Sequence, residues 1–123
     1  MSPYLLVFLG GGFGSLLRYA LGRAMPPTVL GMSFPVSILV VNLLASAVLG
    51  GITGWVTDRP NAEPWRLLLG VGVCGGLSTF SSFSQDNLLL LQEGRVGVAF
   101  VNITLNVLGC LLASTLGWWL VTK

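Results

Sequence analysis

The hydrophobic positions of this chain fall into four long stretches separated by short polar segments. The stretches lie near residues 3–25, 34–56, 65–93 and 96–122. Since a transmembrane helix needs about 20 predominantly apolar residues, each stretch is long enough to cross a bilayer. The polar segment 57–64 is expected to lie in water. The pattern predicts an all-α integral membrane protein in which residues 1–123 form a single domain of four transmembrane helices.

The third stretch is too long for one straight span. Residues 65–93 would extend about 43 Å as one α-helix, whereas the hydrocarbon layer is about 30 Å thick. We therefore expect a break in mid-membrane at residues 75–79, with the first half ending near Gly75 and the second beginning at Ser78 or Thr79. Because lipid cannot satisfy the freed backbone groups, the break must be buried in protein, reached by water or bound to a ligand.

The composition narrows the function classes. Hydrophobic residues make up 54% of the chain and charged residues only 8%, with a net charge of +2, whereas roughly 25% of residues are charged in soluble proteins. These few scattered charges do not indicate a nucleic-acid partner. Without histidine, serine and cysteine nucleophiles lack their usual base, so an enzyme is not expected. Cys74 and Cys110 lie in apolar runs and are interpreted as structural.

Small residues recur four positions apart on several of the predicted helices, as at Gly10 and Gly14 or at Gly50 and Gly54. Such faces allow helix backbones to approach closely in lipid, so a tight bundle is expected. The glycine-rich run at residues 10–15 has Ser15 where a dinucleotide-binding loop needs glycine or alanine, and no strand precedes it. Helix packing is therefore the preferred interpretation of this run.

The basic residues divide evenly between the two membrane sides. With four spans, one side holds Arg59, Arg66 and Lys123, and the other holds Arg18, Arg23 and Arg95. The positive-inside rule then assigns no orientation. We expect insertion in both orientations and pairing of two copies as an antiparallel, dual-topology homodimer. The alternative is a weak bias under which one orientation dominates.

Two phenylalanines and several hydroxyls follow the predicted break. Phe80 and Phe83 are three residues apart and share one helix face, and Ser81 and Ser82 lie between them. The edge of a phenyl ring carries partial positive charge, and hydroxyls are hydrogen-bond donors, so the group could solvate a small anion. The alternative, ordinary packing in the core or against lipid, is about equally well supported.

Other polar residues lie at a similar depth. Asn42, Asn102 and Asn106 offer amide donors to an ion, or they form hydrogen bonds between helices. Arg18 could attract anions to a pore mouth or extend to the interface, and Asp86 is interpreted as an interfacial carboxylate.

Three segments together resemble the signature segments of the Fluc (CrcB) fluoride channels. They are Gly10-Gly11-Gly12-Phe13-Gly14-Ser15-Leu16-Leu17-Arg18-Tyr19, Val41-Asn42-Leu43-Leu44-Ala45, and Gly75-Gly76-Leu77-Ser78-Thr79-Phe80-Ser81-Ser82-Phe83-Ser84. The resemblance covers all four spans. Asp86 stands where the family has glutamate, and Asn102 and Asn106 align where it usually has tyrosine and serine.

The resemblance implies a passive fluoride channel in a bacterial inner membrane, built as an antiparallel homodimer with two pores. It implies a structural sodium ion at the dimer centre, held by the backbone carbonyls of Gly75 and Ser78. It also implies a fluoride pathway formed by Phe80, Phe83, Asn42, Ser81, Ser82 and Arg18, with Thr79 and Asn106 as further candidates.

Two other functions remain to be weighed. A small multidrug exporter also has four helices and dual topology, but it relies on a glutamate in its first helix, and the first span here has no acidic residue. An assembly subunit without transport activity would explain the small-residue faces but not the polar residues of the third span.

Overall fold

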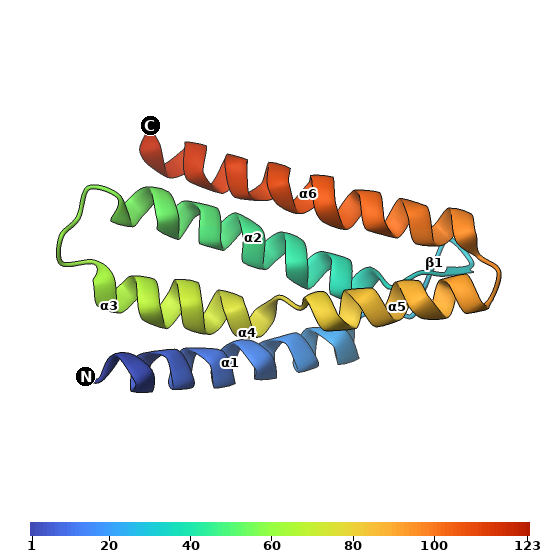
Figure 1. The fold of residues 1–123 in the computed structure, drawn as a ribbon, viewed down its shortest axis with the longest axis horizontal. Helices are drawn as coiled ribbons and strands as arrows, with labels where there is room; N and C mark the ends of the chain where they lie inside the picture. The colour runs from blue at the N-terminus through green and yellow to red at the C-terminus, as the bar shows by residue number, and fades with distance from the viewer.

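The computed structural model describes all residues, 1–123. Its long helices lie side by side (Figure 1). Four helical stretches are long and apolar enough to cross a membrane: Pro3–Ala24, Val36–Val56, Glu63–Gln92 and Val96–Thr122. The first, second and fourth are α1 (Pro3–Ala24), α2 (Val36–Val56) and α6 (Val96–Thr122). The third is divided into α3 (Glu63–Trp65), a π-helix η1 (Arg66–Cys74), α4 (Gly75–Leu77) and α5 (Phe80–Gln92). The predicted all-α fold with four spans and an interrupted third helix is confirmed.

The helices lie in the order α6, α2, third span and α1 across the view of Figure 1. Both termini and the loop between α2 and α3 lie at one end of the bundle. The turn between α5 and α6 lies at the other end, beside a short hairpin. The break in the third span falls near the middle of the bundle, at the depth where a membrane would be most apolar.

The hairpin, β1 (Thr28–Val29) and β2 (Met32–Ser33), was not expected from the sequence. Its two-residue strands pair antiparallel, and the turn uses positive φ angles at Leu30 (51°) and Gly31 (77°). The guanidinium of Arg95 donates a hydrogen bond to the Ser33 carbonyl. This bond links the α1–α2 connection to the start of α6.

The predicted small-residue faces are contact surfaces. A Cβ atom added at Gly10 or Gly14 of α1 would overlap backbone carbonyls of the third span, those of Leu68 and Val73. On the other side of the bundle, Gly50 of α2 lies equally close to the backbone of α6. The absence of side chains at these positions allows helix backbones to touch, as the sequence predicted.

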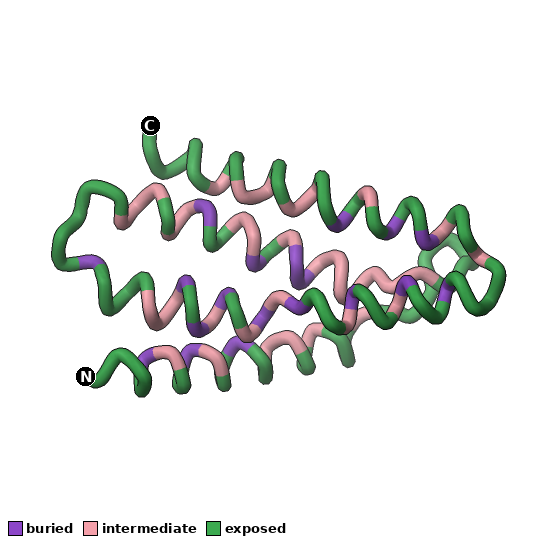
Figure 2. Tube along the Cα trace, in the orientation of Figure 1, coloured by how far each residue is buried: buried purple, intermediate pink, exposed green.

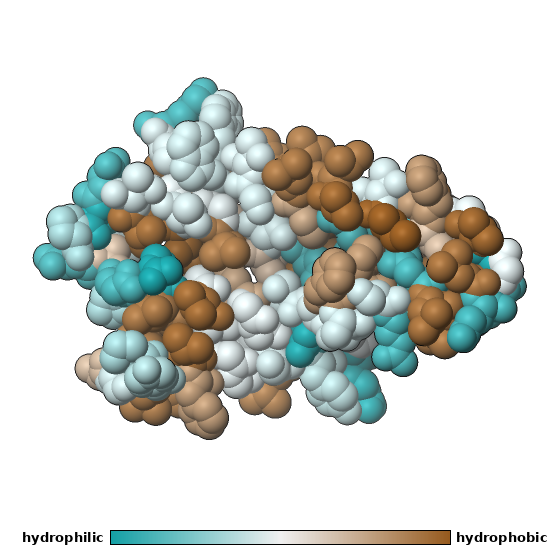
Figure 3. Space-filling model, viewed as in Figure 1, coloured by the Kyte–Doolittle hydropathy of each residue, from teal (hydrophilic) through white to brown (hydrophobic).

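The molecule buries few residues, and large apolar side chains cover much of its surface. Only 19 of 123 residues are buried, and these face one another along the inner sides of the helices (Figure 2). Apolar side chains spread over much of the visible surface, and hydrophilic ones lie in patches toward both ends of the molecule (Figure 3). In water such a surface would be unstable, whereas lipid accommodates it.

The tryptophans are confined to one end of the bundle. All four lie at the end that holds both termini: Trp55 at the end of α2, Trp65 in α3, and Trp118 and Trp119 near the end of α6. Basic side chains lie over two of these rings. Arg59 Cζ is 5.0 Å from the centre of a Trp55 ring, and Lys123 Nζ is 3.9 Å from the centre of a Trp119 ring. Tryptophan and basic residues are typical of the membrane–water interface.

Candidate functional site

The third span breaks at Ser78 and Thr79, inside the predicted segment 75–79, but its first half extends to Leu77. Both have extended backbones (ψ of 157° and 122°), whereas Gly75 remains helical (φ −64°). The prediction that the first half ends near Gly75 was therefore wrong by two residues. Gly76 packs against the backbone of α1, so it serves helix packing. The Thr79 hydroxyl accepts a hydrogen bond from the Ser82 N–H at 3.2 Å and caps α5.

Asn42 of α2 binds the backbone of the break. Its Oδ1 accepts a hydrogen bond from the Thr79 N–H at 2.8 Å, and its Nδ2 donates to the Thr79 carbonyl at 3.3 Å. Both residues are buried. One amide side chain thus satisfies both backbone groups of an extended residue, as a neighbouring strand would. This contact explains how an unwound segment is tolerated at mid-depth.

Further asparagines extend from Asn42 along α6 to α5. Asn42 Nδ2 donates to Asn106 Oδ1 at 3.0 Å, Asn106 Nδ2 donates to Asn102 Oδ1 at 3.0 Å, and Asn102 Nδ2 donates to Asn87 Oδ1 at 3.0 Å. All four side chains are buried. The hydrogen-bonding alternative considered for Asn42, Asn102 and Asn106 describes their contacts in this structure.

Several predicted pathway residues share one hollow beside the break. This break cavity has a volume of about 260 Å³ and is lined by Asn42, Thr79, Phe80, Phe83 and Asn106, and also by Ser46, Ser78, Val107 and Cys110. The centres of the two phenyl rings are 5.5 Å apart, and the ring planes are inclined at 49°. Phe83 is 7% exposed, whereas Phe80 is 78% exposed, so one ring is held inside the bundle and the other projects from it.

Arg18 and Ser82 lie outside the break cavity. They line a second hollow of about 400 Å³, the Arg18 cavity, together with Ser15 and Tyr19 of α1 and Ile38 of α2. Arg18 Nη1 donates to the Ser78 carbonyl at 3.3 Å, so the guanidinium reaches the helix break. Its position therefore differs from that of an arginine that only extends to the interface.

Three hydroxyls lie between these cavities. Thr79 Oγ1 is 3.2 Å from Ser81 Oγ and 3.2 Å from Ser82 Oγ. Thr79 lines the break cavity, and Ser82 lines the Arg18 cavity. A hydroxyl can rotate to donate or accept, so this cluster can change partners without moving the backbone.

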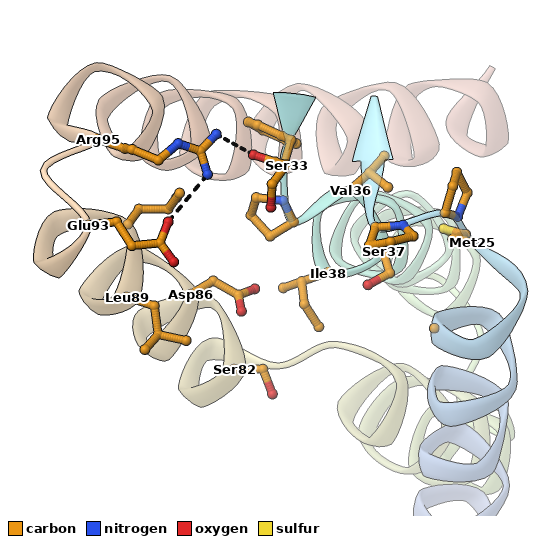
Figure 4. Close-up of a pocket in the computed structure, with 16 residues that line it drawn as sticks. Met25, Ser33, Val36, Ser37, Ile38, Ser82, Asp86, Leu89, Glu93 and Arg95 are labelled. Atoms are coloured by element: carbon orange, nitrogen blue, oxygen red, sulfur yellow. Dashed lines mark hydrogen bonds and ion pairs between the residues drawn. The ribbon is translucent and has the colours of Figure 1, made fainter. Parts of the chain in front are cut away.

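A third hollow lies at the hairpin end of the bundle, with a volume of about 450 Å³. Figure 4 shows Ser82 and Asp86 of α5 facing it, opposite Ile38 of α2. Ser82 and Ile38 also line the Arg18 cavity, so the two hollows adjoin. The Asp86 Oδ2 atom is buried without a hydrogen-bond partner, whereas Glu93 lies 3.5 Å from Arg95. Asp86 thus faces a cavity rather than open water.

Comparison with known proteins gives a family. The family profile described as "CrcB-like protein, Camphor Resistance (CrcB)" matches residues 5–118. The chain belongs to the CrcB family. Its relatives include two proteins named "Fluoride-specific ion channel FluC". The protein from Cronobacter sakazakii is 43% identical over 97% of this chain and 93% of its own length. That from Pyrococcus horikoshii is 43% identical over 96% of this chain and 94% of its own length.

Membership in the CrcB family confirms the resemblance drawn from the three sequence segments. The site of this CrcB chain has two parts: the break cavity with its rings, amides and the Thr79 hydroxyl, and the Arg18 cavity with Ser15 and Ser82. It contains no group of three or more His, Cys, Asp or Glu residues that could hold a metal ion. The Ser78 and Thr79 carbonyls at the break lie outside the helices.

The sequence did not single out every residue of the site. Ser46 and Cys110 line the break cavity, and Asn87, expected only to share the helix face of Phe80 and Phe83, binds Asn102. Asn87 follows Phe83 by four residues, and its Nδ2 donates to the Phe83 carbonyl at 2.9 Å. That spacing was the available signal, because residues four apart share one face of a helix.

Proposed function

We propose that this protein is a passive, fluoride-selective ion channel that lets cytoplasmic fluoride leave the cell down its electrochemical gradient. The supporting observation is the break cavity, in which two phenyl rings meet buried amides and hydroxyls inside an apolar span. Ring edges and hydroxyl donors can replace water around a small anion without a fixed charge that would trap it. The close relatives named as fluoride-specific channels support the same function.

The proposed pathway runs from the Arg18 cavity through the hydroxyl cluster to the phenylalanines. Arg18 raises the local concentration of anions near the break, and Ser81 and Ser82 offer hydroxyl donors. Phe80 and Phe83 then present ring edges beside Thr79, Asn42 and Asn106. A negative-inside membrane potential drives the anion outward, so no energy source is needed.

The functional unit of this proposal is a homodimer. Phe80 is 78% exposed in a single chain, and a conducting path must be enclosed by protein. A second copy placed over the side of the bundle that carries Phe80 would cover the exposed ring. The even division of basic residues supports an antiparallel arrangement, with both copies in the cell membrane, which in a bacterium is the inner membrane.

A topology reporter fused after Lys123 tests the antiparallel arrangement. We expect reporters active on the cytoplasmic side and on the outer side to give comparable signals, because neither end of the bundle carries more basic residues. A signal confined to one side would contradict dual insertion.

A structural sodium ion at the centre of the pair is part of the proposal. The Gly75 carbonyl lacks its usual helical partner, because the Thr79 N–H donates to Asn42 instead, and Gly75 is exposed. The Ser78 carbonyl accepts from Arg18 and keeps a second lone pair. Carbonyl oxygens suit a hard cation, which would neutralise the partial charge of two helix ends.

Removal of sodium tests this site. Replacing sodium by N-methylglucamine is expected to weaken the dimer, because the facing carbonyls would then repel each other without a cation between them. The dimer fraction in detergent, measured by light scattering, is the readout. An unchanged dimer fraction after exhaustive exchange contradicts the sodium proposal.

Fluoride efflux from liposomes tests the function itself. The purified protein is reconstituted, and fluoride-selective and chloride-selective electrodes record efflux after a potassium ionophore is added. Fluoride efflux without chloride efflux supports the channel. No efflux from folded protein overturns it, and proton-coupled export of a cationic drug would instead favour the multidrug exporter.

A further inference from the structure

The four buried asparagines form one continuous line of hydrogen bonds that starts and ends on α5 and its N-cap residue. The Thr79 N–H donates to Asn42, and the line continues through Asn106 and Asn102 to Asn87. Asn87 then donates to the Phe83 carbonyl at 2.9 Å. The line therefore leaves the N-cap of α5, passes through α2 and α6, and returns to α5 one turn later.

The direction of this amide chain is fixed by the backbone group at each end. A backbone N–H can only donate, so Asn42 must turn its Oδ1 toward Thr79. A backbone carbonyl can only accept, so Asn87 must turn its Nδ2 toward Phe83. Between the ends, every amide accepts through oxygen and donates through nitrogen. Reversing any one amide would place two like atoms against each other.

The amides that line the break cavity have few donors to spare. Both hydrogens of Asn42 Nδ2 are engaged, by the Thr79 carbonyl and by Asn106 Oδ1. Asn106 Nδ2 donates to both the backbone carbonyl and the side-chain oxygen of Asn102. An anion in the cavity would therefore meet amides that already hold other partners.

Asn87 and Asn102 do not line the break cavity, although both are buried at 6% and 1% exposure. Asn102 accepts a hydrogen bond from Asn106 and donates one to Asn87, and Asn87 donates to the Phe83 carbonyl. Asn106 and Phe83 both line the cavity. Asn87 thus acts on the cavity through the Phe83 backbone carbonyl, and Asn102 acts on it through the Asn106 side chain. Unpaired, such buried amides would be costly, so each one depends on its neighbour in the chain.

We propose that Asn87 and Asn102 are positioning residues: together with Asn106 and Asn42 they hold α5 against α2 and α6, which form the other walls of the break cavity, and thereby set its anion selectivity. This inference rests on the proposed fluoride channel function. Thr79 and Phe83 line the cavity from one side, and Asn42 of α2 and Asn106 of α6 line it from the others, so a broken link lets these walls move apart. The wider cavity then admits an anion larger than fluoride.

The Asn87→Leu variant tests the proposal, because leucine has a similar volume and no polar atom. Loss of this link is expected to lower fluoride flux about tenfold, the effect of roughly one buried hydrogen bond. The reversal potential in fluoride–chloride gradients is expected to move toward that of a less selective channel. Asn102→Ser is the second variant, since serine is too short to bridge Asn87 and Asn106.

Thr104→Val is the matched control. Thr104 lies on α6 between Asn102 and Asn106, but its hydroxyl donates only to the Phe100 carbonyl, at 2.9 Å, on the exposed face. This variant removes one hydroxyl at the same depth without touching the chain. We expect flux, reversal potential and dimer content to equal those of the unmodified protein.

A spectroscopic readout separates positioning from a general loss of stability. The side-chain ¹⁵N resonance of Asn42 is expected to shift in the Asn87→Leu protein and not in Thr104→Val, although Asn42 and Asn87 share no hydrogen bond. Folded Asn87→Leu or Asn102→Ser protein with unchanged flux and reversal potential overturns the inference, even if the resonance moves. No fluoride flux from the unmodified protein would instead overturn the proposed function.

Discussion

Fluoride flux is expected to fall about tenfold or more in the Phe83→Ile variant. Isoleucine fills much of the same space but has no ring edge, and the contribution of an aromatic ring beyond its buried area is about 1 kcal/mol or somewhat more. Phe83 is only 7% exposed and lines the break cavity, so its ring faces the polar groups there. Electrode recordings from liposomes at equal protein density measure the change.

Phe8→Ile is the control for this variant. Phe8 lies on α1, is 75% exposed and touches no part of the break cavity, so its replacement is expected to leave flux unchanged. Phe80→Ile is expected to lower flux as Phe83→Ile does, because both rings line the same cavity. Unchanged flux in both cavity variants would mean that the rings only fill space.

The Gly14→Ala variant is expected to destabilise the bundle by about 2 kcal/mol or more, because an added methyl group must push two helix backbones apart. A Cβ atom at Gly14 would overlap the Val73 carbonyl and lie 2.9 Å from the Leu77 nitrogen. Movement there would displace α4 and the break that follows it. Thermal unfolding in detergent, followed by the loss of monodisperse dimer, gives the magnitude.

Gly12→Ala provides a matched control on the same helix. A Cβ atom at Gly12 meets nothing within 4 Å, so the methyl group points away from the bundle. The stability of this variant is expected to equal or slightly exceed that of the unmodified protein, since alanine favours helix more than glycine does. Equal losses at positions 12 and 14 would show that the close contact with η1 and α4 contributes nothing.

The four spans could be predicted from the sequence because the length of each apolar stretch can be read directly from consecutive residues. The break could also be placed approximately, because a straight helix of that length does not fit a bilayer. Its position within the segment depended on tertiary contacts. Asn42, far away in the sequence, binds the backbone of Thr79, while the close approach of Gly76 to α1 favours a helical backbone there.

The hairpin at residues 28–33 left no comparable signal. Its strands have two residues each, too few for an alternating pattern, and its turn places Leu30 at a positive φ angle that leucine rarely adopts. The bond from Arg95 to Ser33 joins positions far apart in the sequence. Such a segment is specified by its neighbours rather than by its own residues.

The candidate site was predicted in its residue types but not in its arrangement. The family resemblance grouped Phe80, Phe83 and Asn42 with Ser81, Ser82 and Arg18, and of these only the first three share the break cavity. It could not show that Arg18 and Ser82 lie on the other side of the break, nor that the asparagines bind one another. Those facts depend on which helices are neighbours.

The confinement of every tryptophan to one end has a consequence for how the proposed pair sits in lipid. In a parallel pair, all eight indoles would anchor in one leaflet and leave the other leaflet with none. In an antiparallel pair, each leaflet receives the indoles of one subunit, so the two anchoring forces oppose each other. Such a particle resists sliding along the bilayer normal and keeps its broken helices level with the midplane, whichever way the first copy entered.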